Sequence, residues 1–352
     1  METTTSRTTS RTARRTAFGA DFDVPDGYLN TASIGIPPVA VADAVAEAIS
    51  AWRTGAAQAY DFDEPVARAR AGFAALAGVD PARVTIGSAV SPLVGLVAAS
   101  VPDGTRVLVA EGEFTSVSWP FAVHAGRGVT LTECPLDKLG DRAGEFDLVA
   151  VSVVQSADGR IADLDALRAA QAGGTRVVLD ATQSLGWFDA DIAWADAVVG
   201  AAYKWLLGPR GAAWMAVAPD VELTPLHANW YAGQERWSAV YGVPPDLARD
   251  ARALDTSPAW YCHVGAAAAL PWLAGLDRAA VRAHCAGLAD AFRIGLGMEA
   301  TGSAIVSIRR DDAIERLRAA GVAAASRAGG ARLSFHLYNT EADVARALAA
   351  LT

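Results

Sequence analysis

The chain has 352 residues, of which 52% are hydrophobic and 20% are charged, so we expect two compact domains rather than one core or a disordered chain. Its net charge of -9, without any run of Lys and Arg interleaved with aromatic residues, excludes a broad nucleic-acid-binding surface. Cys134, Cys262 and Cys285 are odd in number and far apart, which argues against a disulfide framework or a zinc site and favours a reducing cytoplasm.

The first segment, residues 1–25, is rich in Ser, Thr and Arg and predicts a disordered tail. The Arg14-Arg15 pair raises a twin-arginine export signal as an alternative, but no apolar segment follows it.

Residues 41–235 predict a large α/β domain. Helices are expected over 39–52 and over 64–78, where apolar residues recur at helical spacing and Gly78 ends the pattern. Apolar segments at 83–88, 106–111, 128–134, 148–154, 175–181, 197–202 and 212–217 are the candidate strands. Because helical segments such as 91–101 and 163–173 alternate with them, they predict a mainly parallel seven-stranded sheet covered on both faces.

The last third of the chain predicts a smaller α+β domain, formed by residues 236–352 together with the N-terminal segment 26–40. One long helix is expected from 263 to 295, followed by strand, helix, strand and helix up to residue 351. The apolar stretches at 89–101 and 265–276 are shorter than the roughly 20 residues that a membrane helix needs, so no membrane partner is expected.

Three segments carry polar residues at the carboxyl ends of predicted strands, where ligands bind in open α/β sheets. Ser88 and Ser91 stand at the start of an apolar helix, where they could hold a phosphate or simply cap the helix. Asp180 ends a hydrophobic strand and needs a cation or strong donors, unless it caps the next turn. Lys204 follows the next strand; an apolar pocket would free its amine to attack a carbonyl, whereas a surface lysine would extend into water.

Together, a phosphate cradle, an acid at a strand end and a lone lysine are the parts needed to bind pyridoxal 5′-phosphate. The order of motifs strengthens this interpretation: YLNTASIGIPP, IGSAVS, EGEFTSVSWPF, LDATQSLG, GAAYKWLLGPRG, LDTSPAW and RLSFHLYNTEADV. This order resembles the class V aminotransferase group of fold-type I pyridoxal-phosphate enzymes, which includes cysteine desulfurases, kynureninases and isopenicillin N epimerase. The resemblance covers nearly the whole chain after residue 25.

The resemblance implies a role for each matching residue around the cofactor ring. Lys204 would form the Schiff base and then move the proton at the substrate α-carbon. Asp180 would keep the pyridinium nitrogen protonated, Gln183 would bind the phenolic oxygen, and Phe114 would stack on the ring.

At the phosphate end, the resemblance implies contacts from Ser88 and Ala89, with Tyr203 beside the lysine. Ser257 would reach the phosphate of a neighbouring subunit, which implies a homodimer with shared active sites. Ala201 stands where relatives often have a hydroxyl donor, and Tyr203 replaces the His of desulfurases, so this sequence departs from the family pattern here.

The substrate side of the site is implied to contain Arg332, which would grip a carboxylate with its bidentate guanidinium, together with Asn30 and Ser33. No cysteine follows Cys285, which argues against a desulfurase that forms a persulfide on a mobile loop; Cys262 and Cys285 are expected in the core or an interface. His336 is expected to be structural.

Four aromatic residues, Trp230, Tyr231, Trp237 and Tyr241, are expected in a subunit interface, with a substrate pocket as the alternative. The sequence thus predicts an aminotransferase-like enzyme that acts on an α-amino acid through an external aldimine. The alternatives are a lyase that cleaves a C–S or C–C bond or an epimerase of the same family, and a cofactor-binding regulatory protein. A nucleotide-binding enzyme is disfavoured because no glycine-rich phosphate loop follows any strand.

Overall fold

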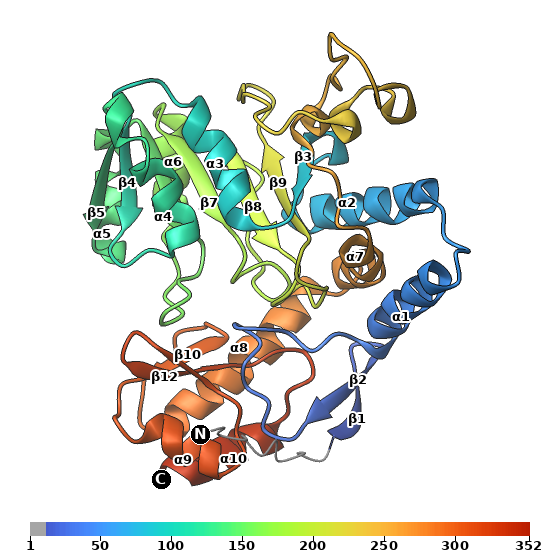
Figure 1. The fold of residues 1–352 in the computed structure, drawn as a ribbon. Coiled ribbons are helices and arrows are strands. Elements are labelled where there is room, and N and C mark those ends of the chain that lie inside the picture. Colours follow the sequence, from blue (N-terminus) through green and yellow to red (C-terminus); the bar gives the residue numbers. More distant parts are fainter. Residues whose placement is uncertain (1–11) are drawn as a thin grey trace, which may run out of the picture.

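In the computed structural model, which describes residues 12–352, the strands of the large domain form one sheet in the order β3-β9-β8-β7-β6-β4-β5 (Figure 1). They are β3 (Val84–Gly87), β4 (Arg106–Ala110), β5 (Thr130–Cys134), β6 (Leu148–Ser152), β7 (Arg176–Asp180), β8 (Ala197–Ala201) and β9 (Ala213–Val217). β9 runs antiparallel to β3 and β8, and the other neighbouring pairs are parallel. The predicted α/β fold with a mainly parallel seven-stranded sheet is confirmed.

The two faces of the sheet bury alternate residues of each strand. On β6, Leu148 and Ala150 belong to one apolar cluster, and Val149 and Val151 belong to the other. α3 (Val90–Ser100) and α4 (Thr115–Ala122) contribute to the first cluster, and α2 (Asp63–Ala77), α5 (Leu136–Arg142), α6 (Leu164–Ala172) and α7 (Trp260–Ala274) contribute to the second. This two-sided burial explains why the strands inside the sheet are largely apolar, whereas the edge strand β5 is partly exposed and contains Thr130, Thr132 and Glu133.

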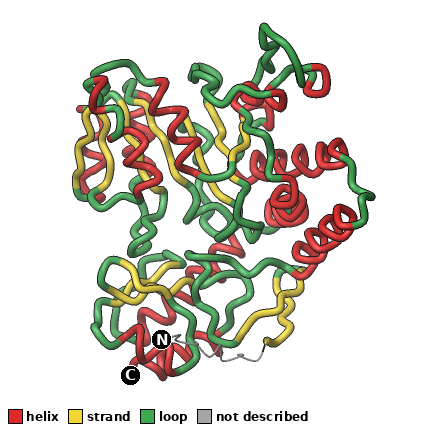
Figure 2. The backbone as a smooth tube through the Cα atoms, viewed as in Figure 1, coloured by secondary structure: helices red, strands yellow, loops and turns green. Residues whose placement is uncertain are grey.

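The carboxyl ends of β6, β7 and β8 meet at one edge of the sheet because these strands are parallel. Figure 2 shows loops gathered on this side, between the sheet and the smaller part of the molecule. Ser152, Asp180 and Ala201, the last residues of the three strands, therefore lie side by side at this edge.

The helix predicted over 263–295 is wrong as a single element. It is divided into α7 and α8 (Arg278–Gly295), and α1 (Val39–Arg53) packs against α7. Gly275 ends α7, and the side chain of Asp277 accepts a hydrogen bond from the backbone N–H of Ala280 at the start of α8. An aspartate at this position begins a new helix because it satisfies an N–H group that has no partner within the helix.

The smaller part contains a three-stranded antiparallel sheet, β10-β12-β11, covered by helices. Its elements are β10 (Ile305–Ile308), α9 (Ala313–Ala319), β11 (Ala325–Arg327), β12 (Gly330–Ser334) and α10 (Glu341–Leu351), with α8 packed on them. The N-terminal segment joins this part through parallel bridges from Tyr28 to Ala323 and from Asn30 to Ser334. α7, which is expected in the smaller domain, packs on α2 of the large one. The division of the chain into domains at residues 40 and 235 stays a prediction.

The predicted tail over 1–25 is wrong for its described part, and residues 1–11 lie outside the described residues. β1 (Thr12–Ala17) and β2 (Ala20–Pro25) form an antiparallel hairpin. Phe22 and Val24 are fully buried, and Arg15 Nη1 lies 2.6 Å from Asp343 Oδ2. The hairpin is thus held by contacts with distant parts of the chain, which composition alone does not reveal. Within the described part of the chain, every helix is too short or too polar to cross a membrane.

Candidate active site

A cavity of about 180 Å³ lies at the carboxyl edge of the sheet. Its walls include seven of the predicted site residues: Ser88, Ala89, Phe114, Asp180, Gln183, Tyr203 and Lys204. Ser257, Arg332, Asn30 and Ser33 are not part of the wall. The structure therefore brings most of the predicted cofactor residues together from four strand ends and the helices that follow them.

Lys204 is the only lysine in the cavity wall. Its residue surface is only 6% exposed, so the interpretation as a surface lysine is wrong. The pKa of Lys204 is lowered to about 8, mainly by burial and in part by the charges of three arginines, while the charge of Asp180 acts in the opposite direction. The Nζ atom lies 5.4 Å from the ring centroid of Phe114 and 5.5 Å from that of Tyr203. Much of this amine is therefore neutral near pH 8, as a nucleophilic lysine requires.

The loop that carries Lys204 is held by the N-terminal segment. The backbone N–H of Gly35 donates to the carbonyl oxygen of Tyr203 at 2.9 Å, and that of Gly208 donates to Ala202 at 2.9 Å. A Cβ atom on Gly35 would collide with the carbonyl oxygen of Lys204 and with Leu207. The glycine is thus required by the close approach of two backbones.

Asp180 is the last residue of β7 and is only 5% exposed. Burial raises the pKa of its carboxyl, while hydrogen bonds from Thr182 and the charge of Lys204 act in the opposite direction. The backbone N–H of Thr182 donates to Oδ1 at 2.8 Å, and the carboxylate makes no ion pair with a described residue. A buried carboxylate that faces a cavity in this way is suited to a ligand that carries an N–H donor with positive charge.

Gln183 is fixed by its neighbours. Its Nε2 donates to the carbonyl oxygen of Ala32 and to Ser156 Oγ, each at 3.0 Å, and its Oε1 accepts from Trp205 Nε1 at 2.7 Å. The side-chain amide therefore joins the N-terminal segment to the loops after β6 and β8.

The start of α3 is open toward the cavity. Ala89 is the N-cap residue, and no side chain caps this helix, so the interpretation of Ser88 or Ser91 as a simple cap is not supported. The first N–H groups of an α-helix have no partner within the helix and favour an anion. Ser88, Ser116 and Arg210 also line this cavity, and a phosphate would find hydroxyl donors and a positive charge there.

Arg332 reaches the wall of the cavity from β12. Its Nη1 donates to Ser156 at 2.6 Å (O) and 3.0 Å (Oγ), and its Nη2 donates to Ser33 Oγ at 2.8 Å. Arg332 is only 1% exposed and has no acidic partner within residues 12–352, and burial together with the charge of Arg327 lowers its pKa to about 10. Asn30 contributes a buried Oδ1 without a hydrogen-bond partner. A buried guanidinium bound only to neutral groups favours an incoming carboxylate.

The sequence model of the aminotransferase class-V family matches residues 28–312. The chain belongs to this family. Enzymes of the family use pyridoxal 5′-phosphate, which is the cofactor of this protein.

Two curated relatives of this class V protein are isopenicillin N epimerases. That of Streptomyces clavuligerus is 29% identical over 203 residues, which cover 52% of this chain and 50% of the relative. That of Amycolatopsis lactamdurans is 29% identical over 185 residues, with 46% of each chain covered. The chain thus spans about half the length of the curated relatives it matches.

Solved structures of low sequence identity share the class V fold. The cysteine desulfurase CsdA of Escherichia coli superposes with a TM-score of 0.77 at 20% identity, with 93% of this chain and 94% of that chain covered. A C-DES variant with glycine covalently linked to its cofactor gives 0.81 at 19% identity, with 92% and 95% covered.

The cavity fits pyridoxal phosphate on three observations. The buried carboxylate of Asp180, which has no ion pair with a described residue, lies in the cavity wall. The backbone N–H groups at the start of α3 have no side-chain cap, and the buried Lys204 with its lowered pKa lies in the loop after β8. These groups match the pyridine nitrogen, the phosphate and the aldehyde of the cofactor.

Residues that sequence reasoning missed also line or support this class V site. Arg210 and Ser156 are in the wall, and Glu113 lies behind Ser152. Glu113 is buried and accepts hydrogen bonds from Ser152, Gln155 and the N–H of Phe114. Burial raises its pKa, and these donors oppose that effect. Arg210 is the basic residue of the lysine motif itself, and Ser156 closely follows β6, so both positions carried a detectable signal.

Other predicted residues lie outside the cavity. Ser257 is exposed, and the preceding Asp255 is anchored to Arg70 and to β3. His336 is fully buried, with Nε2 3.0 Å from the carbonyl oxygen of Trp205, in agreement with a structural role. Cys285 is buried and Cys262 is partly buried, and neither lines the cavity. Over residues 12–352, no group of His, Cys, Asp or Glu is arranged to hold a metal ion.

The predicted aromatic cluster is only partly a cluster. The rings of Trp230 and Trp237 are 5.1 Å apart and those of Trp230 and Tyr231 are 5.3 Å apart, whereas Tyr241 is 92% exposed. None of the four lines the active-site cavity, so the substrate-pocket alternative finds no support there.

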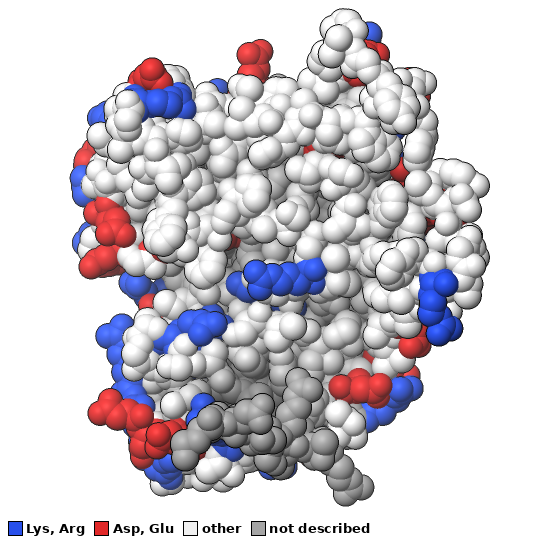
Figure 3. Space-filling view, in the orientation of Figure 1, with Lys and Arg blue, Asp and Glu red and all other residues white. Residues whose placement is uncertain are grey.

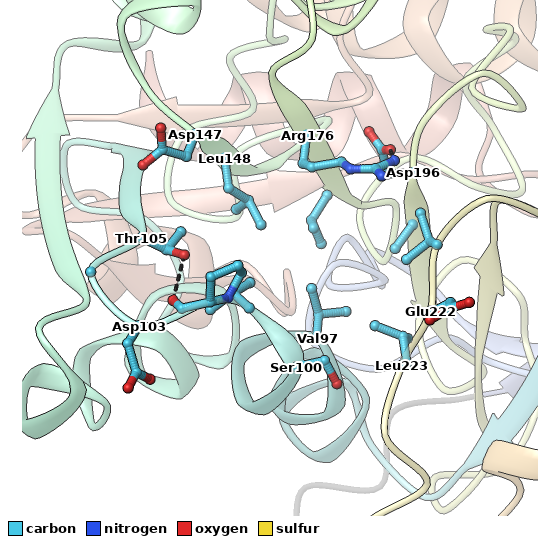
Figure 4. A pocket seen from close by; sticks show the side chains of 16 residues that line it. Val97, Ser100, Asp103, Thr105, Asp147, Leu148, Arg176, Asp196, Glu222 and Leu223 are labelled. Atoms are coloured by element: carbon cyan, nitrogen blue, oxygen red, sulfur yellow. Dashed lines mark hydrogen bonds and ion pairs between the residues drawn. The ribbon is translucent and has the colours of Figure 1, made fainter.

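A larger cavity, of about 460 Å³, lies at the opposite edge of the sheet, where β4, β6, β7 and β8 begin (Figure 4). Leu148, Val97 and Leu223 form apolar walls, and charged groups lie around them. Most of these charges are already paired, as in Arg176 with Asp196 at 2.5 Å. This cavity contains no nucleophilic lysine or unpaired arginine, and we place the chemistry at the carboxyl edge.

Proposed function

We propose that this protein is an aminotransferase-like enzyme that uses pyridoxal phosphate to remove and replace the α-proton of an amino acid. The observation that carries the proposal is the buried Lys204, with its pKa lowered to about 8, in a cavity shared with the unpaired Asp180 and the open start of α3. When bound, the cofactor supplies an aldehyde that combines with amines and a ring that accepts the electrons released at the α-carbon.

Residues of this chain would hold the cofactor in place and transfer the proton at the substrate α-carbon. Lys204 would hold the cofactor between turnovers and then carry the proton to and from the α-carbon. Asp180 would keep a proton on the ring nitrogen, which maintains the ring as an electron acceptor. Phe114 would cover the ring, and Gln183 would orient its oxygen substituent.

Two further groups of residues would bind the phosphate of the cofactor and the α-carboxylate of the substrate. Ser88 and the backbone N–H groups after Ala89 would hold the phosphate, with Tyr203 beside them. Arg332 would bind the substrate α-carboxylate, and Ser33 and Asn30 would support it from the N-terminal segment. These are the roles that the resemblance to the family implies, and the contacts of the side chains support them.

Epimerisation is the second candidate because the two curated relatives carry that name. It requires a proton donor on the face of the α-carbon opposite Lys204. Tyr203 is a hydroxyl-bearing residue of the cavity wall near the lysine, with 5.5 Å between its ring centroid and Lys204 Nζ, and is our candidate for this donor. A lyase that cleaves a C–S or C–C bond would share every cofactor residue and is the third outcome of the test.

The proposal is tested first by the absorbance of the purified protein with added pyridoxal phosphate. We expect a band above 400 nm, its loss in Lys204→Ala, and its retention in Lys138→Ala, a variant of a lysine outside the cavity. No band in the wild type, or an unchanged band in Lys204→Ala, would refute the proposal.

The reaction type follows from incubating the holoenzyme with L-amino acids. Pyridoxamine phosphate and a keto acid indicate transamination, a D-amino acid with solvent deuterium at the α-carbon indicates epimerisation, and pyruvate or sulfide without cofactor conversion indicates a lyase. The same preparations test the homodimer that the resemblance to the family implies, in which Ser257 would reach the phosphate bound by the partner subunit. Light scattering at micromolar concentration should give twice the monomer mass of 36.5 kDa.

A further inference from the structure

Three arginines whose charges act on Lys204 have no acidic partner among the described residues. Arg210 lines the cavity and lies 5.1 Å over the ring of Tyr203. Arg332 binds serines only, and the one side-chain hydrogen bond of Arg327 goes to the carbonyl oxygen of its neighbour Ser326 at 2.8 Å. Most other arginines of residues 12–352 form ion pairs, such as Arg70 with Asp255. In Figure 3, a basic side chain lies at the junction of the two parts of the molecule.

The β11–β12 hairpin places two of these arginines on one face. Arg327 pairs with Gly330, and Ala325 pairs with Arg332, in antiparallel register. Residues 325 and 327 point to the same side of a strand, and directly paired residues share that side, so Arg327 and Arg332 face the same way. Arg327 and Arg332 are diagonal neighbours on the two strands, and the Cα atoms of such a pair are about 7–8 Å apart.

The turn of the hairpin is short and fixed. Ala328 and Gly329 both have positive φ angles, of 47° and 77°, which matches the two-residue turns that join antiparallel strands tightly. Because Arg332 reaches Ser156 in the cavity wall, the face it shares with Arg327 is the face turned toward the site.

The positive charges of the three arginines act on Lys204. Arg332, Arg327 and Arg210 each lower the pKa of Lys204, and Arg327 also lowers that of Arg332. Between the buried Lys204 and Arg332 such repulsion is unfavourable unless anions occupy the site, whereas the charge of the exposed Arg327 is partly screened by water. A bound phosphate would neutralise the charge at the start of α3 and at Arg210, which line the same cavity, and the substrate α-carboxylate would neutralise Arg332. Arg327 remains without an anion.

We propose that the substrate is an α-amino acid with a second anionic group at the end of its side chain, and that Arg327 binds this group. This inference rests on the proposed function, with Arg332 on the α-carboxylate. The chemical class is a dicarboxylic amino acid, because a carboxylate accepts two hydrogen bonds from one guanidinium. Arg327 would determine specificity and would take no part in proton transfer.

The test compares acidic and neutral amino acids of similar size with the holoenzyme. The pairs are L-aspartate and L-asparagine, L-glutamate and L-glutamine, and L-2-aminoadipate and L-norleucine. The readouts are the change in cofactor absorbance and the values of kcat and KM. We expect at least one acid to be preferred about tenfold or more, since a hydrogen bond to a charged group contributes about that factor.

Variants test whether Arg327 causes the preference for acidic amino acids. Arg327→Gln should lower kcat/KM for the preferred acid about 10- to 100-fold, mainly through KM, and should change kcat/KM for its neutral counterpart much less. Arg318→Gln, an exposed arginine on α9, is the matched control and should change neither. Arg332→Gln should weaken the acid and the neutral compound alike.

Two results would overturn the inference while the proposed function stands: a cofactor band with equal use of acids and neutral compounds, or an Arg327→Gln variant that weakens both alike. If the wild type forms no cofactor band, the proposed function fails, and this inference fails with it.

Discussion

Replacing Gly35 by Ala should disable the active site from outside the cavity wall. The new Cβ atom would lie 2.0 Å from the carbonyl oxygen of Lys204 and 2.6 Å from Leu207 Cδ2, whereas real Cβ atoms keep at least 3.0 Å from other heavy atoms. The two backbones must therefore separate by about 1 Å, which also stretches the hydrogen bond from Gly35 to Tyr203. Overpacking costs about 1–3 kcal/mol and the hydrogen bond about 1 kcal/mol.

The functional effect should exceed the loss of stability. A displacement of about 1 Å at a reacting group can lower a rate about 100-fold, and Lys204 is in the displaced loop. The assay is the rate of amino-acid-dependent change in cofactor absorbance, measured with the urea midpoint of unfolding.

Gly95→Ala is the matched control because a Cβ atom on this helical glycine meets nothing within 4 Å. It should retain the wild-type rate and gain up to about 1 kcal/mol of stability, since alanine favours a helix over glycine. Equal rates for Gly35→Ala and wild type would refute the idea that the close approach of these backbones positions the lysine.

Two further predictions concern charge. Because the pKa of Lys204 is lowered to about 8, capture of added pyridoxal phosphate by the apoprotein should speed up about tenfold from pH 7 to pH 9, as the protonated amine gives way to the neutral one. A stopped-flow rise centred near 10.5 instead would contradict this burial effect. Arg70→Ala should lower the free energy of unfolding by about 3–5 kcal/mol, because it leaves Asp255 charged and buried. Arg168→Ala, which breaks an exposed pair with Asp191, should cost less than about 1 kcal/mol, and equal urea midpoints would refute the distinction.

Local sequence patterns were sufficient for the large domain. Most of the seven strands are short, largely apolar segments that alternate with helical segments, and their order along the chain restricts how they can assemble. The positions of Asp180 at the end of β7 and of Lys204 in the loop after β8 follow from the same pattern, since ligands bind at the carboxyl edge of such sheets. The predicted residues that line the cavity are mainly those that follow these strands.

Local sequence patterns could not predict the contacts between segments that lie far apart in the chain. The hairpin over residues 12–25 is stabilised by the burial of Phe22 and Val24 and by the ion pair of Arg15 with Asp343, more than 300 residues away. The break between α7 and α8 at Gly275 depends on one N-cap that competes with a continuous apolar pattern.

By itself, the sequence determined the α/β class, the family motifs and the lysine and aspartate at neighbouring strand ends, because each depends on residues close together in the chain. Only the tertiary structure decided that Lys204 is buried, that Gly35 supports its loop, and that Arg327 shares a face with Arg332. Burial, close approach and the sum of charges depend on which distant segments meet, and they set the pKa of the lysine and the number of anions that the site can accept.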